Sequence, residues 1–311
     1  MGKAIREVYG EALAKYGKDD ERIVALDADL SGSTKSAIFG KACPERFLNV
    51  GIAESNMVGM AAGLASVGKI PFVNTFTVFL TTLGLCAARA FGSYSQLPIK
   101  FAGAYGGMSD AFDGPSHHAL EDIAVMRSLA NVQVFVPCDA VQTEWLVKYA
   151  IDTRKPIYLR LSRDKFKDLY TSETEFAPGK GIVVREGTDI TVIACGLMVG
   201  NAIDAAEELA KEGISVRVVD MFSIKPIDEA LIVRCAKETG AIVSAEEHNI
   251  YGGLGSAVAE VLTKHGCGVT QGFVGVNDCH GECGPYKKLL AKYGLDANAI
   301  ANKVRETLAK K

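Results

Sequence analysis

The segment that decides the fold reads GIAESNM and spans residues 51–57. The short apolar run before it, at 47–50, is typical of a buried strand. The small apolar residues after it predict a helix from about Ala53 to Val67. Glu54 therefore lies in the first helical turn, where a negative charge complements the helix dipole. Such placements are common, so this segment alone leaves open whether Glu54 is structural or catalytic.

Outward from this segment, strands and helices alternate along the chain, which predicts an α/β fold with largely parallel sheets. In the first half we expect strands at 23–26, 47–50, 69–76, 99–102, 132–136 and 156–161, and helices at 53–67, 78–92 and 139–151. A polar stretch at 164–180 has the composition of a linker. Beyond it we expect strands at 188–195, 215–220 and 241–245 and helices at 199–212, 228–239, 252–265 and 298–310. We therefore predict two parallel-sheet α/β domains, at 1–170 and 171–311.

The composition is that of an ordinary globular protein. Of the 311 residues, 48% are apolar and 23% are charged, and the net charge is −3. This charge gives no reason to expect nucleic acid or a membrane surface as a partner. The first residues lack the apolar core of a signal peptide, so we expect a cytoplasmic protein.

Eight scattered cysteines indicate reduced thiols and not a disulfide framework. One group, Cys267, Cys279, His280 and Cys283, has ligand types that zinc binds. Its spacing contains no close Cys-x-x-Cys pair, so we expect no metal ligand on this chain, and zinc stays an alternative.

The 51–57 segment closely resembles the motif of the pyrimidine-binding domain in transketolases and related thiamine diphosphate enzymes. In that family the motif's glutamate binds N1′ of the cofactor's aminopyrimidine and has a catalytic role, which the resemblance gives to Glu54. This chemistry needs a carboxylate in an apolar site, where its pKa can rise toward neutrality.

Two further segments of the first domain resemble cofactor-binding parts of transketolase. The segment DLSGS at 29–33 implies that Asp29 approaches the cofactor and that Ser33 binds substrate phosphate. The segment NTFTVF at 74–79 implies that Phe76 and Phe79 hold the pyrimidine ring. The family often has a third aromatic residue where this chain has Thr82, which predicts a thinner stacking platform.

Two other segments resemble the transketolase substrate channel. In DGPSH at 113–117, the resemblance implies that Asp113 contacts the sugar C2 hydroxyl and that His117 has a catalytic and substrate-binding role. In RLSR at 160–163, it implies that Arg163 binds the acceptor phosphate, a dianion that suits a guanidinium. Tyr105 departs from the histidine common in transketolases, which leaves the donor sugar open.

The second half resembles the carboxy-terminal domain of the same superfamily, at 218–228 and 246–255. The run Gly-Gly-Leu-Gly at 252–255 is similar to a dinucleotide loop, but no acidic partner follows at the required spacing. The segment 279–284 lies where relatives have a Gly-Glu-Ser-Gly loop, which argues against zinc there.

The Gly-Asp-Gly motif that binds the diphosphate and its metal does not occur in this sequence. The resemblance therefore implies a split enzyme, with thiamine diphosphate bound between this chain and an N-terminal transketolase subunit that carries the motif. We expect Mg²⁺ or Ca²⁺ to be bound mainly by that partner, in a heterotetramer. The implied reaction is the transfer of a two-carbon ketol unit between sugar phosphates.

Three alternatives remain open at this point. The β subunit of a 2-oxo-acid dehydrogenase has the same layout, although Asp113, His117 and Arg163 favour sugar phosphates. Deoxyxylulose-phosphate synthase is a close cousin but is normally one long chain. A non-catalytic regulatory subunit could keep the fold, although the intact Glu54 argues against it.

Overall fold

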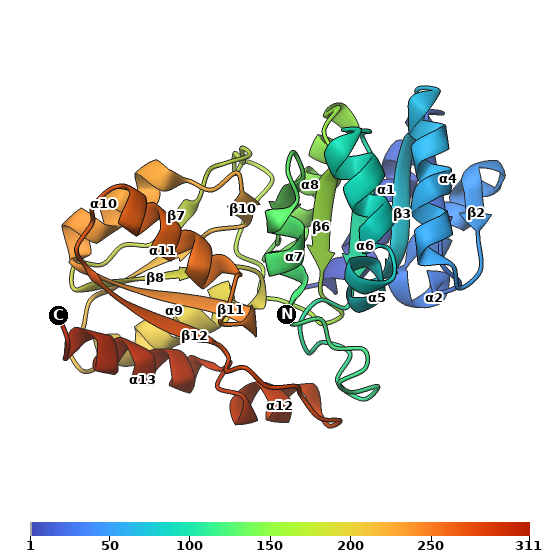
Figure 1. Ribbon diagram of the computed structural model, residues 1–311. Coiled ribbons are helices and arrows are strands. Elements are labelled where there is room, and N and C mark those ends of the chain that lie inside the picture. The colour runs from blue at the N-terminus through green and yellow to red at the C-terminus, as the bar shows by residue number, and fades with distance from the viewer. Residues whose placement is uncertain (1) are drawn as a thin grey trace.

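The computed structural model describes residues 2–311 (Figure 1). A seven-stranded sheet is the centre of its first half. Its order is β10-β5-β6-β4-β3-β1-β2. The bounds are Ile23–Asp27 (β1), Phe47–Asn49 (β2), Ile70–Phe76 (β3), Lys100–Ala104 (β4), Gln133–Phe135 (β5), Ile157–Leu161 (β6) and Ser223–Lys225 (β10). All pairings are parallel except that of β10 with β5. The central strands are buried throughout, as apolar parallel strands must be.

Helices cover both faces of this sheet. Alternate strand residues point to opposite faces, so Phe72 packs toward α1 and α8 while Val73 packs toward α4. The helices are Ile5–Asp19 (α1), Ser31–Thr34 (α2), Ser36–Ala42 (α3), Glu54–Ser66 (α4), Thr77–Thr82 (α5), Leu85–Ala87 (α6), Asp122–Ser128 (α7) and Ala140–Asp152 (α8), with a 3₁₀ turn at Pro44–Arg46.

The prediction of one continuous helix at 78–92 is wrong. The segment divides into α5, α6 and a π-helical turn at Ala88–Tyr94. Thr81 and Thr82 both donate side-chain hydrogen bonds to carbonyls one turn earlier, at Thr77 and Val78. Such bonds compete with the helical backbone and bend it.

The second half contains a five-stranded sheet in the order β12-β11-β8-β9-β7. Its strands are Ile182–Arg185 (β7), Ile190–Ala194 (β8), Val216–Asp220 (β9), Ala241–Asn249 (β11) and Thr270–Val276 (β12), and β7 alone runs antiparallel to its neighbour. Its helices are Leu197–Ala210 (α9), Glu229–Thr239 (α10), Leu254–Lys264 (α11), Tyr286–Lys292 (α12) and Ala297–Leu308 (α13). The predicted class, two mostly parallel-sheet α/β domains, is confirmed.

The two halves are joined through β10, which lies in the second half of the chain but pairs with β5 of the first sheet. Lys225 in β10 also donates hydrogen bonds to the carbonyls of Arg127 and Leu129. We propose a boundary between the two domains near residue 170. The strand β10 follows this boundary in the chain but pairs with the sheet of the first domain. Within residues 2–311, no helix is both long and apolar enough to cross a membrane.

The strand register brings distant segments to one edge of the first sheet. Asp27 of β1 pairs with Asn74 of β3, and Phe76 at the end of β3 pairs with Ala104 at the end of β4. Ala104 in turn pairs with Leu161 at the end of β6. Because ligands in open α/β sheets bind beyond the carboxyl ends of the strands, the loops that follow these strands form the candidate site.

Candidate active site

Glu54 is the first residue of α4 and is buried, with 3% of its surface exposed. Its Oε1 accepts a hydrogen bond of 3.1 Å from Thr75 Oγ1 of β3. The adjoining turn is apolar, since Met57, Val58 and Ala61 are fully buried. A carboxylate in such surroundings, at the positive end of a helix, is held in one place and can exchange a proton with a ligand.

An aromatic platform begins at Phe76, the last residue of β3, which directly follows Thr75 in the chain. The rings of Phe76 and Phe79 are stacked, with centroids 5.9 Å apart and planes at 19°. His117 approaches both rings edge-on, at 6.0 and 5.3 Å. Tyr105 packs on Phe76 at 4.4 Å, so it brings a third aromatic ring to the platform from another strand. Thr82 is exposed, and its hydroxyl donates to the Val78 carbonyl.

The two aspartates around the end of β1 differ in environment. Asp27 is fully buried and accepts hydrogen bonds from Leu30 N, Thr34 Oγ1 and Ser36 Oγ at 2.6–2.7 Å. Burial raises the pKa of Asp27 despite these bonds. Asp29 is exposed, has a φ of 65° and accepts from Asn49 Nδ2 at 2.8 Å. Asp27 thus shapes the loop, while Asp29 keeps a carboxylate accessible at the edge of the sheet.

Two arginines flank Tyr105. The guanidinium carbons of Arg6 and Arg163 lie 4.9 and 5.3 Å from the centre of its ring. Arg6 Nη1 donates to the Ser33 carbonyl at 2.7 Å and to the Tyr105 hydroxyl at 2.5 Å. These contacts bring Ser33 and Arg163, both expected at the substrate phosphate, to one basic wall. Arg6 was not predicted, because a lone arginine in an amphipathic helix carries no signal of its own.

The loop after β4 contributes both expected and unexpected acidic residues. Asp113 is exposed, and His117 is half-buried with its Nδ1 2.9 Å from Ser116 Oγ. Asp110, which the sequence analysis did not identify, is buried and forms an ion pair of 2.9 Å with Arg163. Burial and the neighbouring Asp113 raise the pKa of Asp110 to about 6.

Comparisons with known proteins agree with this arrangement. Two family models match the chain: transketolase, pyrimidine binding domain, over residues 1–168, and transketolase, C-terminal domain, over residues 179–300. A putative transketolase C-terminal section from Methanocaldococcus jannaschii is 42% identical over 310 residues, covering 99% of this chain and 97% of that protein. This chain belongs to the transketolase family. It is a transketolase-type enzyme subunit that matches the C-terminal part of the family.

Two further relatives cover almost the whole of this transketolase subunit. The 6-deoxy-6-sulfo-D-fructose transketolase subunit SqwH of a Clostridium species is 39% identical over 307 residues, covering 99% of this chain and 95% of that protein. A solved structure described as a split gene transketolase, inactive beta4 tetramer, matches with a TM-score of 0.90 at 48% identity and covers 99% of each chain. These relatives favour a transketolase over the β subunit of a 2-oxo-acid dehydrogenase.

Membership of the transketolase family implies dependence on thiamine diphosphate. The residues present fit the pyrimidine half of that cofactor, because the chain has a buried carboxylate at Glu54 and a pair of stacked rings at Phe76 and Phe79. The sequence lacks the Gly-Asp-Gly motif for the other half.

The second domain of the subunit holds the substrate loop in place. Glu247 at the end of β11 accepts hydrogen bonds from Met108 N at 2.8 Å and from Tyr286 Oη at 2.9 Å. Burial raises the pKa of Glu247 to about 7. Arg160 of β6 donates to the Glu247 carbonyl at 2.8 Å and forms a buried ion pair with Asp122 at 2.7 Å. Contacts from the second domain therefore fix the loop that carries Asp110 and Asp113.

The alternative zinc group is not assembled. Within residues 2–311, no cluster of three or more His, Cys, Asp and Glu side chains is arranged to hold a metal ion. The loop at 277–285 packs on the substrate loop instead, with Cys283 against Gly114 and Gly284 N donating to the Ala111 carbonyl at 3.0 Å. The glycine-rich turn at 252–255 is also accounted for, since Glu246 accepts from Leu254 N and Gly255 N at 2.7 and 2.8 Å.

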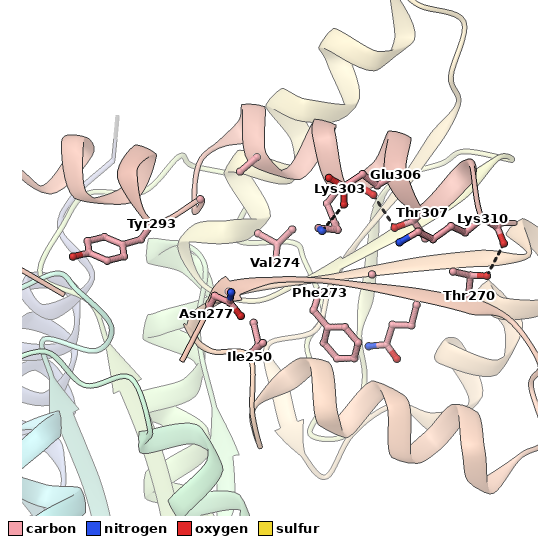
Figure 2. Close-up of a pocket in the computed structure, with 15 residues that line it drawn as sticks. Ile250, Thr270, Phe273, Val274, Asn277, Tyr293, Lys303, Glu306, Thr307 and Lys310 are labelled. Carbon is pink, nitrogen blue, oxygen red and sulfur yellow. Dashed lines mark hydrogen bonds and ion pairs between the residues drawn. The ribbon is translucent and has the colours of Figure 1, made fainter. Parts of the chain in front are cut away.

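A separate hollow of about 470 Å³ lies on the outer edge of the second sheet, between β12 and α13 (Figure 2). Val274 and Thr270 of β12 line one side, and Lys303 and Thr307 of α13 line the other. None of the candidate catalytic or substrate-binding residues lines this hollow. It is therefore not part of the candidate active site.

Proposed function

We propose that this chain forms the catalytic site of a two-subunit transketolase that transfers a two-carbon ketol unit between sugar phosphates. The observation that carries the proposal is the buried Glu54 beside the Phe76–Phe79 platform, in a chain that lacks the diphosphate motif. This combination supports one half of a cofactor site in this chain and the other half in an N-terminal subunit.

In the proposed reaction, Glu54 holds a proton toward N1′ of the aminopyrimidine. Phe76 and Phe79 pack against the ring and exclude water from it, and Asp29 approaches the cofactor from the end of β1. When bound, thiamine diphosphate supplies a nucleophilic carbon that can cleave the bond beside a ketose carbonyl. The burial of Glu54 and the hydrogen bond from Thr75 support its role, because both hold the carboxyl group in one place.

The substrate is bound along the basic wall and the loop after β4. Asp113 accepts a hydrogen bond from the sugar C2 hydroxyl, and His117 contacts substrate hydroxyls beside the aromatic platform. The acceptor's phosphate is bound by Arg163 and Ser33, with Arg6 as a further cation at the same wall. Two guanidinium groups on one aromatic ring support this assignment, since guanidinium suits phosphate oxygens well.

The partner subunit supplies the diphosphate site and binds Mg²⁺ or Ca²⁺, and the assembly is a heterotetramer. Apolar side chains near Glu54 support a partner surface. Ile52 is 82% exposed, and the exposed Phe91 lies next to Gly59 on α4. The solved split gene relative, described as an inactive beta4 tetramer, also supports the need for a second kind of subunit. A cytoplasmic location stays a prediction.

The experiment that tests this proposal compares the isolated chain with the assembled pair. We expect the purified chain to show no ketol transfer with thiamine diphosphate and Mg²⁺. Co-purification with the subunit that carries Gly-Asp-Gly should restore a metal-dependent activity, measured with a ketose phosphate donor and an aldose phosphate acceptor. Robust turnover by the single chain would contradict the split site.

A further inference from the structure

Arg163, the residue assigned to the acceptor phosphate, is already engaged by a buried acid. Its Nη1 donates to Asp110 Oδ1 at 2.9 Å. The Arg163 side chain is 40% exposed, whereas that of Asp110 is 1% exposed. Asp110 Oδ2 is also buried and has no hydrogen-bond partner within residues 2–311. An unpartnered carboxylate oxygen at a substrate-binding arginine is costly for folding alone, which points to a role toward a ligand.

The charged and titratable groups that face Asp110 leave its charge incompletely balanced. The neighbouring Asp113 on the same loop raises the pKa of Asp110, whereas Arg163 and His117 lower it. His118 also lies next to the Asp110 backbone, and burial lowers the pKa of that imidazole. Two carboxyl groups thus share one permanent cation, and each anion destabilises the other.

We propose that Asp110 is a specificity-determining residue. In the empty site it forms an ion pair with Arg163, so binding of an acceptor depends on the charge of the acceptor's terminal group. The inference rests on the proposed function, because it takes Arg163 as the residue that binds the acceptor's anionic end. An incoming anion must share Arg163 with the Asp110 carboxylate or bind while Asp110 is neutral. When the Asp110 carboxyl group is ionised, it therefore disfavours binding of an acceptor with a terminal dianion. When that carboxyl group is protonated, such an acceptor can bind.

The direction of the pH dependence follows from this competition. A bound anion favours the neutral form of Asp110, so the pKa of Asp110 is higher in the complex than in the empty site, where it is about 6. Affinity for the anion is then full below that value and is lost as pH rises from it toward the higher pKa of the complex. Phosphate titrates in the same range. Sulfate stays a dianion throughout, so it reports on the protein alone.

The test measures sulfate binding to the assembled two-subunit enzyme by calorimetry between about pH 5.5 and pH 8, a range that spans the pKa of Asp110. We expect the affinity of the wild type for sulfate to fall by roughly tenfold from the lowest to the highest pH, because the ionised Asp110 carboxylate repels sulfate at a half-buried site. Asp110→Asn should keep its affinity to within about twofold, and so should Asp110→Ser if the first variant fails to assemble. Glu260→Gln, which removes an exposed carboxylate paired with Arg127, should behave as wild type.

Equal pH profiles in the wild type and both neutral variants would overturn the proposal, because these proteins differ only at Asp110. Weaker sulfate binding in the neutral variants would also overturn it, since Asp110 would then position Arg163 for the anion. Ketol transfer is measured on the same preparations. A lack of transfer in the wild type contradicts the proposed function, whereas the sulfate profiles still report on Asp110.

Discussion

Tyr105 is the residue that joins the aromatic and basic parts of the site. Its ring packs on Phe76 on one side and lies under the guanidinium groups of Arg6 and Arg163, and its hydroxyl accepts a hydrogen bond from Arg6. Its backbone has a φ of 63°, which is uncommon for an aromatic residue and indicates a position fixed by its surroundings. A sugar chain passing from the aromatic platform to the basic wall would therefore pass this side chain.

The Arg163→Ala variant tests the basic wall. We expect KM for phosphorylated acceptors to rise by roughly tenfold to a hundredfold, because a charge-assisted hydrogen bond contributes about 1.5–3 kcal/mol. KM for an unphosphorylated acceptor should change little. Arg154→Ala is the matched control, since Arg154 is exposed and precedes β6 at the opposite edge of the sheet. Steady-state kinetics with both acceptors check this, and equal effects on them would argue for a different substrate class.

Among the structural elements, the loop between β4 and α7 depends most on the second domain. Met108 N donates to Glu247, and Gly107, with a φ of 70°, lies directly against the carboxyl group of that residue. A side chain at Gly107 would clash with Glu247 and would also require a backbone conformation that favours glycine. The second domain therefore fixes the position of this loop.

The Gly107→Ala variant tests this coupling. We expect a loss of unfolding free energy of about 1–3 kcal/mol, from backbone strain and the clash together. KM for the acceptor should rise, because the loop carries Asp113 and Asp110. The matched control is Gly213→Ala, which has a φ of 80° but meets no atom within 4 Å. Urea denaturation measures the stability of both variants, and steady-state kinetics measure their KM for the acceptor. Equal losses of stability together with equal KM values would contradict the coupling between the second domain and this loop.

For the molecule as a whole, the sequence predicted what depends on strand order and local motifs. Asp29, Phe76 and Arg163 follow different parallel strands, so their convergence at one edge follows from the α/β pattern. Arg6 and Asp110 could not be predicted in the same way. Their roles depend on the long-range contacts with Tyr105 and Arg163, which no local pattern encodes. The strand β10 was not predicted for the same reason, since its three residues form a strand by pairing with β5, which is distant in the sequence.

The same contrast applies to Glu54. Its position at the start of α4 was predicted, but its burial and the hydrogen bond from Thr75 depend on packing against β3, which no local pattern encodes. Glu229 illustrates the simple case of a helix-dipole partner. It lies in the first turn of α10, outside the candidate site, and pairs with Lys264 at the surface.

The most direct test of the account is exchange of the thiazolium C2 proton, followed by NMR in deuterated buffer on thiamine diphosphate bound to the assembled two-subunit enzyme. With Glu54→Gln the complex should assemble and still bind cofactor, but exchange should slow by at least about a hundredfold, the range for losing general acid–base assistance. Glu229→Gln should exchange at the wild-type rate. Wild-type exchange in Glu54→Gln would contradict the catalytic role and would support a regulatory subunit.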